Sequence, residues 1–204
     1  ERPPGLRVYV KSRPSTPTSY KDAIDVLKRY DVWDKVPQSV RTYLEKADPR
    51  YDAIKPGELD NKPQYHFRVM GPEYMLEAAK RKAEQLDVNA AIIASSLSDV
   101  EAQAAGETLA YMAQEVEVNG RPFEPPCVFL CGGELLVTVG KGKGLGGRNQ
   151  EFVLSTVPRI DGSKNIVVAS ADSDGTDGPT DAAGGIADGY TMGRAKELGL
   201  DIFE

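Results

Sequence analysis

The feature that most restricts the fold is an alternation of strand-like and helix-like segments that begins near Tyr65. YHFRVM reads as a strand, PEYMLEAAKRKAEQL as a helix, NAAIIAS as a strand and DVEAQAAGETLAYMAQEVEV as a long helix. Ser98 and Glu101 have capping-box spacing at the expected start of the long helix. Strands that alternate with helices favour a parallel, doubly wound sheet. We therefore expect an α/β protein with a parallel, Rossmann-like sheet.

A second α/β unit is expected after the segment NGRPFEPP, whose three prolines in eight residues mark a linker. The segments CVFLCGG and ELLVTVG read as two short strands. They are followed by a Gly-rich loop, a helix from about Asn149, the strand NIVVAS, an Asp-rich loop and a last helix near residues 190–198. This order predicts a second, mixed α/β domain.

The charge balance bears on the class of partner. The chain has a formal net charge of −6 and a pI of about 5.0, which argues against binding to nucleic acid or to an anionic membrane surface. No apolar run approaches the roughly 20 residues that a membrane-spanning helix needs. We expect a cytoplasmic protein with a small-molecule partner. The start without Met, in a Pro-rich stretch, and the end directly after a helix are typical of an internal fragment.

The cysteine and histidine content restricts the chemistry. Cys127 and Cys131 lie in one expected strand, too far apart for a mutual disulfide, and are expected to be small buried apolar side chains. His66 is the only histidine. Catalytic triads based on His and zinc sites with several His ligands are therefore excluded within this chain.

The stretch GKGKGLGGRNQEF is the first candidate site. Its glycines allow backbone N–H groups to turn toward an anion, the helix start adds partial positive charge, and the side chains add cations. We expect a phosphate or a carboxylate to bind through Lys141, Lys143, Gly144, Gly146, Gly147, Arg148 and Asn149.

Other interpretations of this loop remain open. Gly142, Gly144 and Gly147 also satisfy G-x-G-x-x-G, with Asp172 as a candidate ribose-binding acid of a dinucleotide site. A Walker motif is contradicted, because Arg148 and Asn149 follow the last glycine instead of Lys and Ser or Thr. A third interpretation is a mobile, solvated loop without a ligand.

The stretch ADSDGTDGPTDAAGG is the second candidate site. It places Asp172, Asp174, Asp177 and Asp181 within ten residues, directly after an apolar strand. Carboxylates this close repel one another unless a cation or several N–H groups neutralise them, and Mg²⁺ is the natural cation. The alternative is that each Asp caps a turn or a helix.

The two motifs together closely resemble the glycerate 2-kinase family that carries the MOFRL domain, some of whose members were labelled hydroxypyruvate reductases. SRPSTPTSYKDAIDVLKRY and VEAQAAGE extend the resemblance over essentially the whole chain. The resemblance implies ATP-dependent, Mg²⁺-assisted phosphorylation of the 2-hydroxyl of D-glycerate in a cleft between two α/β domains. It implies that residues 1–122 are the C-terminal part of a Rossmann-like N-terminal domain. Residues 123–204 would then be the N-terminal part of the MOFRL domain.

The resemblance also assigns roles to residues. Arg148 matches the arginine of the family's G-G-R-N-Q-E motif and would be the catalytic residue that binds the substrate carboxylate or a phosphate. Asp174, Asp177 and Asp181 match the family's aspartates and would hold the metal, whereas Asp172 stands where many members have Gly. Arg13 departs from the family's S-G-P-T motif.

These roles lead to expectations for the whole chain. Its partners would be glycerate and ATP, and a homo-oligomer is left open. The chain alone would be inactive, because half of the cleft would be absent. Two alternatives are an NAD(P)H-dependent hydroxypyruvate reductase and a non-catalytic module that binds a metal and an anion.

Overall fold

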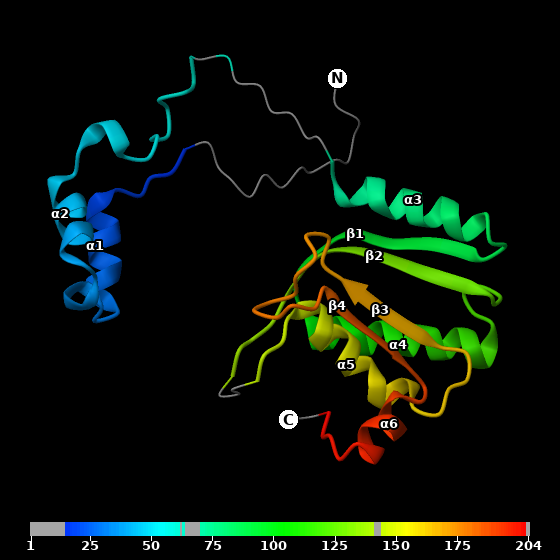
Figure 1. Cartoon of the computed structure of the whole chain (residues 1–204). Coiled ribbons are helices and arrows are strands. Elements are labelled where there is room, and N and C mark those ends of the chain that lie inside the picture. The colour runs from blue at the N-terminus through cyan, green and yellow to red at the C-terminus, as the bar shows by residue number, and fades with distance from the viewer. Residues whose placement is uncertain (1–14, 62, 64–69, 141–143, 203–204) are drawn as a thin grey trace. The chain divides into compact units, whose positions relative to one another are not determined.

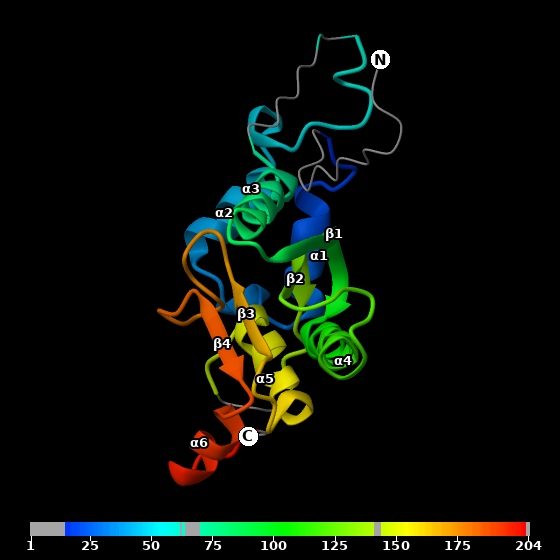
Figure 2. The ribbon, with the colours of Figure 1, turned by 90° about the vertical axis from the view of Figure 1, so that its right-hand side faces the viewer.

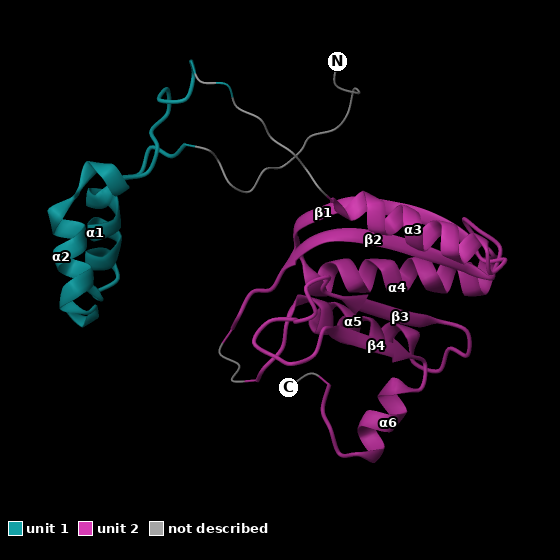
Figure 3. Ribbon diagram, turned by 45° about the horizontal axis from the view of Figure 1, so that its top comes forward, with its two compact units in different colours: residues 1–67 teal, residues 68–204 magenta. Residues whose placement is uncertain are grey.

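The computed structural model describes residues 15–61, 63, 70–140 and 144–202. The chain divides into two compact units, residues 1–67 and 68–204, each described here by itself (Figure 3). His66 with most of its expected strand, Arg13, and the binding candidates Lys141 and Lys143 lie outside the described residues.

Unit 1 contains a pair of short α-helices with two 3₁₀ turns. Its elements are α1 (Tyr20–Arg29), η1 (Trp33–Lys35), α2 (Gln38–Lys46) and η2 (Pro49–Tyr51). The backbone N–H of Ser19 donates to Asp22 over 2.7 Å and so caps the start of α1. The rings of Tyr20 and Tyr43 meet edge to face with centroids 5.9 Å apart, which joins the two helices.

The first half of unit 2 contains the predicted alternation of helices and strands. Its elements are α3 (Pro72–Glu84), β1 (Asn89–Glu101), α4 (Ala102–Asn119) and β2 (Cys127–Leu136). Strands β1 and β2 pair in parallel. Helix α3 lies on one face of this pair and α4 on the other (Figure 1). The α/β class is therefore confirmed.

The second half of unit 2 is mixed. Its elements are α5 (Arg148–Ile160), β3 (Val167–Ala171), β4 (Gly184–Asp188) and α6 (Thr191–Glu197). Strands β3 and β4 pair antiparallel. Helix α5 lies between α4 and the β3–β4 pair (Figure 2). The core of unit 2 is the apolar face that α4 and α5 share, and it contains Ala102, Ala105, Ala110, Phe152, Val153, Val157, Ile160, Ile166 and Ala187.

The start of the long helix is one of the points where the sequence prediction is wrong. Residues 98–101 continue β1, and α4 begins at Ala102. Ser98 and Glu101 pair with Glu134 and Leu136 of β2, so sheet pairing replaces the expected capping box. The segments CVFLCGG and ELLVTVG likewise form one strand, β2, up to Leu136.

The domain boundary expected at residue 122 stays a prediction. Strand β1 precedes it and pairs with β2, which follows it, and the division between the two units falls at residues 67 and 68. Cys127 and Cys131 lie in β2 as free thiols. Within the described ranges, none of the helices is both long and apolar enough to cross a bilayer.

Gly106 allows the two central helices to approach closely, and its replacement gives a first prediction. A Cβ atom at Gly106 would lie 2.1 Å from Ser155 Oγ and 2.4 Å from the carbonyl oxygen of Phe152. We expect Gly106→Ala to lower the free energy of unfolding by about 2 kcal/mol, because α4 and α5 must separate. Urea unfolding followed by circular dichroism measures this loss.

Gly193→Ala provides the matched control. Gly193 lies in helix α6, and nothing lies within 4 Å of an added Cβ atom there. Alanine is the better helix former by about 0.8 kcal/mol, so this variant is expected to be slightly more stable. An equal stability of the Gly106→Ala variant and the wild type would contradict the close helix contact.

Candidate functional site

The candidate site lies at the start of α5, where Arg148 is the first helical residue. Arg148 Nη1 is 2.8 Å from Glu134 Oε1 on β2, and Arg148 Nε is 3.9 Å from Asp172 Oδ2, directly after β3. The Arg148 side chain is 36% exposed. The fold thus brings one solvent-accessible guanidinium between two carboxylates that come from distant parts of the sequence.

The Gly-rich loop has an open part and a closed part. Gly144 and Gly146 are exposed, and no atom lies within 4 Å of an added Cβ at either position. A Cβ at Gly147, in contrast, would lie 2.3 Å from Asp177 Cγ, and a Cβ at Gly178 would lie 2.1 Å from the carbonyl oxygen of Gly146. The end of the Gly-rich loop therefore rests directly on the Asp-rich loop.

Asp177 is the residue on which this contact centres. Its side chain is fully buried. Asp177 Oδ1 accepts from the backbone N–H of Asn149 (3.1 Å) and from Asn149 Nδ2 (3.0 Å). Asp177 Oδ2 accepts from the backbone N–H of Gln150 (2.8 Å) and from Gln150 Nε2 (3.1 Å). One carboxylate thus caps the first turn of α5 from a loop that follows β3.

The pKa of Asp177 reflects two opposing effects. Burial raises the pKa of the carboxyl group, but the hydrogen bonds from the backbone and side chains of Gln150 and Asn149 lower it more. The net pKa lies below the usual value for Asp. The carboxylate is therefore stabilised as an anion by N–H donors.

Asn149 lies inside a polar network and does not face the solvent. Its side-chain oxygen accepts from Ser170 Oγ over 2.5 Å, and its Nδ2 donates to Asp177 and, over 3.4 Å, to Asp172 Oδ2. Asn149 is 9% exposed. In the structure, the Asn149 side chain forms hydrogen bonds with Ser170, Asp177 and Asp172. Its contact with a bound phosphate stays a prediction.

The predicted magnesium ligands do not converge. Over residues 15–61, 63, 70–140 and 144–202, no three His, Cys, Asp or Glu side chains are placed to hold a metal ion. Asp174 is exposed and accepts from the backbone N–H of Thr176 over 3.1 Å in a local turn, and Asp181 is exposed. Asp177 does not fit, because N–H donors surround both of its oxygens. Assignment of Mg²⁺ to these residues stays a prediction.

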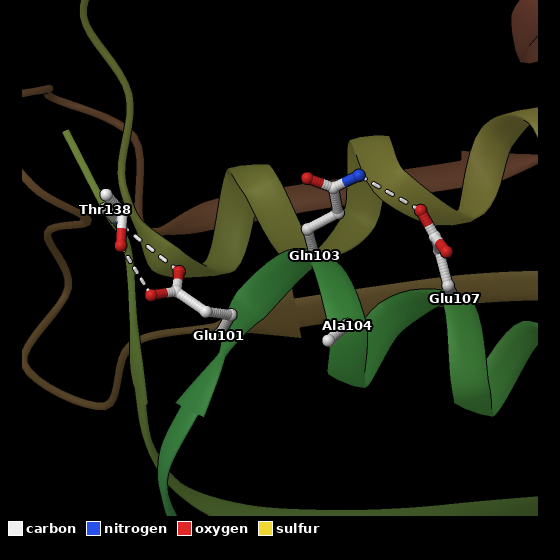
Figure 4. A pocket seen from close by; sticks show the side chains of 5 residues that line it. All are labelled: Glu101, Gln103, Ala104, Glu107 and Thr138. Carbon is white, nitrogen blue, oxygen red and sulfur yellow. Dashed lines mark hydrogen bonds between the residues drawn. The ribbon is translucent and has the colours of Figure 1, made fainter. Parts of the chain in front are cut away.

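Glu101 is a residue to which the sequence assigned only a capping role. Its carboxylate accepts from the backbone N–H of Thr138 (3.1 Å) and from Thr138 Oγ1 (2.6 Å), and so ties the end of β1 to the segment that follows β2 and leads into the Gly-rich loop (Figure 4). The pKa of Glu151 is raised by burial and by the negative charge of Glu101.

A pocket of about 380 Å³ lies beside Glu101 and is lined by Glu101, Gln103, Ala104, Glu107 and Thr138 (Figure 4). Two of these side chains are acidic and none is cationic. The pocket is therefore unsuited to an anion and is separate from the site around Arg148.

Glu134 was missed at the sequence level. It lies in GGELL, where a single Glu in a strand carries no motif signal. Its role follows only from the fold, which places the Glu134 carboxylate beside Arg148 at the start of α5. Asp172 was ranked below the other aspartates, yet its carboxylate is the one nearest to Arg148 in the Asp-rich loop.

Comparisons with known proteins agree on one family. Residues 127–204 match the MOFRL family. Over 187 residues the chain is 42% identical to the glycerate 2-kinase of Pyrococcus horikoshii. The aligned region covers 91% of the chain and 42% of that protein. Over 197 residues the chain is 37% identical to the D-glycerate 2-kinase of Thermotoga maritima. This alignment covers 96% of the chain and 44% of that protein.

A solved structure is also similar. The crystal structure of a glycerate kinase from Thermotoga maritima matches with a TM-score of 0.66 and 35% identity, over 91% of this chain and 42% of that one. The chain therefore spans less than half the length of each of these three relatives.

Proposed function

We propose that this chain, whose residues 127–204 match the MOFRL family and which resembles glycerate 2-kinases over most of its length, forms part of the active site of a D-glycerate 2-kinase. The reaction would transfer the γ-phosphoryl group of ATP to the 2-hydroxyl of D-glycerate. The Rossmann-like and MOFRL halves expected at residues 1–122 and 123–204 are part of this proposal.

The observation that carries the proposal is the position of Arg148. Its guanidinium is accessible, lies on the first turn of α5 and directly follows a loop with two exposed glycines. A guanidinium binds a carboxylate or a phosphate through two parallel N–H donors. Arg148 would therefore hold the carboxylate of glycerate or an oxygen of the transferring group, and the N–H groups of Gly144 and Gly146 would add further donors.

The chain's own contribution to such a reaction is alignment and charge stabilisation, since phosphoryl transfer needs little covalent chemistry from the protein. Bound ATP supplies the phosphoryl group. We propose that Mg²⁺ enters together with the nucleotide phosphates, as is usual for this ion. A cytoplasmic location is part of the proposal.

One prediction tests the division of the active site. The 204-residue chain is expected to show no ATP-dependent phosphorylation of D-glycerate by itself, because it spans 42% of the Pyrococcus horikoshii relative. That relative, with its matching segment replaced by this chain, is expected to phosphorylate glycerate. A coupled assay of ADP formation measures both proteins, and circular dichroism checks that each is folded.

The same assay separates the competing functions. Oxidation of NADH with hydroxypyruvate by the chimera would favour a reductase. A folded chimera with neither activity would favour a binding module. ATP consumption by the isolated chain would contradict the expected division of the site.

A further inference from the structure

We infer that Asp177 is a positioning residue, whose carboxylate occupies the anion-binding end of α5 and so fixes the place of Arg148. The inference rests on the proposed function for its consequence in catalysis. Its structural part, the hold of Asp177 on the first turn of α5, can be tested without any enzymatic activity.

The Asp177 carboxylate has a limited capacity to accept hydrogen bonds. An ionised Asp can accept at about four lone-pair positions. In this structure Asp177 accepts four hydrogen bonds of 2.8–3.1 Å, two from backbone N–H groups and two from side-chain amides. Little capacity is left for a metal ion, and the N–H donors already offset the buried negative charge.

The N–H groups at the start of α5 already have an anionic partner in Asp177. The first N–H groups of a helix have no partner within it and attract anions. In α5 the N–H groups of Asn149 and Gln150 both point to Asp177, and the N–H of Glu151 donates to the carbonyl oxygen of Gly147 over 2.9 Å. The N–H groups of Asn149, Gln150 and Glu151 are therefore already used and do not bind a substrate anion. Such an anion must be bound by the Arg148 side chain and by the open part of the Gly-rich loop.

Asp177 is linked to Arg148 through the two residues on either side of Arg148. Arg148 stands between Gly147, which touches Asp177, and Asn149, which donates to Asp177 twice. Asn149 also donates to Asp172, whose carboxylate lies near the Arg148 guanidinium. The backbone of Arg148 and one of the two carboxylates beside its side chain thus depend on the same contact.

Asp188 provides a control of the same chemical kind. Asp188 Oδ1 accepts from the backbone N–H of Tyr190 and from Thr191 Oγ1, each over 3.0 Å, at the start of α6. It lies at the end of β4 that pairs with Val167, whereas Asp172 follows the opposite end of β3. Asp188→Asn therefore weakens the hydrogen bonds of an Asp before a helix, including the one from Arg194, in the same unit but away from Arg148.

The first experiment compares amide hydrogen exchange in the wild-type chain, Asp177→Asn and Asp188→Asn by NMR. An asparagine at 177 turns an NH₂ group toward N–H donors and removes one acceptor. The amides of Asn149 and Gln150 are expected to exchange at least about tenfold faster in Asp177→Asn than in Asp188→Asn. Equal exchange rates in all three proteins would overturn the inference.

The second experiment measures binding with inorganic phosphate as the probe, followed on the Arg148 Nε–H resonance. We expect Asp177→Asn to bind phosphate at least about fivefold more weakly than the wild type, and Asp188→Asn to bind it as the wild type does. A merely structural role would lower the stability of both variants and leave both affinities unchanged. Equal affinities would therefore overturn the positioning role.

The third experiment distinguishes positioning from metal binding. Mg²⁺ titration of the wild-type chain and of Asp177→Asn is expected to give the same response, because Asp177 is not a ligand. A response in the wild type that disappears in Asp177→Asn would overturn the inference. Absence of phosphate binding by the wild type would count against the proposed function instead, and the amide exchange would still decide the role of Asp177.

Discussion

Arg148→Ala is expected to lower turnover by at least about a hundredfold in the chimera of this chain with the Pyrococcus horikoshii glycerate 2-kinase. The variant removes the accessible guanidinium next to the Gly-rich loop and leaves Glu134 and Asp172 without the cation that lies near both of them. Loss of one charged donor that stabilises a transition state costs about 10²- to 10³-fold in turnover. Steady-state kinetics with D-glycerate and ATP measure the effect.

Two further variants, Arg148→Lys and Glu134→Gln, test why the guanidinium of Arg148 is needed. Lysine keeps the charge but cannot present two parallel donors, so Arg148→Lys is expected to remain at least about tenfold below the wild type. Glu134→Gln keeps the size of the side chain and removes one neighbouring charge. It tests whether the carboxylate orients the guanidinium. Near-normal turnover of Arg148→Ala would refute the role assigned to Arg148.

Asp177→Asn is expected to lower the free energy of unfolding at pH 7 by about 3 kcal/mol, since it leaves buried N–H donors without acceptors. The cost should depend on pH. The folded-state pKa of Asp177 lies below the unfolded value, which is about 3.9. The carboxylate therefore contributes its stability above the unfolded pKa, and this contribution is lost as the pH falls through the folded pKa.

Urea unfolding of both proteins between pH 7 and pH 3 measures this dependence. The difference in stability between wild type and Asp177→Asn is expected to be largest near neutral pH and to shrink below about pH 4. Titration of other carboxyl groups, such as Asp188, occurs in both proteins and cancels in the difference. A difference that stays constant over this range would contradict the ionised state of Asp177.

The sequence predicted the fold class and the start of α5 well, because both depend on local patterns. The alternation of apolar segments indicated the helices and the parallel strands, and the helix expected from about Asn149 begins at Arg148. Strand β4 was missed because GGIAD is rich in residues that disfavour strands. It forms through pairing with β3, where Ala169 lies opposite Ile186.

The candidate site was predicted in its parts but not in its arrangement. The two motifs that were singled out do meet, through Gly147 and Asp177. The sequence could not separate the roles of the aspartates, because residues in one loop look alike until their partners are known. Asp177 faces N–H donors, Asp172 lies near Arg148 and Asp174 closes a turn. Glu134 and Glu101 gain their contacts, with Arg148 and Thr138, only once the chain is folded.

Gly146 and Gly147 contact Asp177 and Gly178 so closely that neither Gly147 nor Gly178 has room for a side chain. This contact matters for protein engineering and for the divergence of related chains. Neither loop keeps its shape without the other, so a side chain acquired on one surface demands a compensating change on the other. The two loops should be inherited as a pair and show correlated substitutions. A designer who transplants the arginine-bearing loop into another scaffold must transfer the aspartate loop with it.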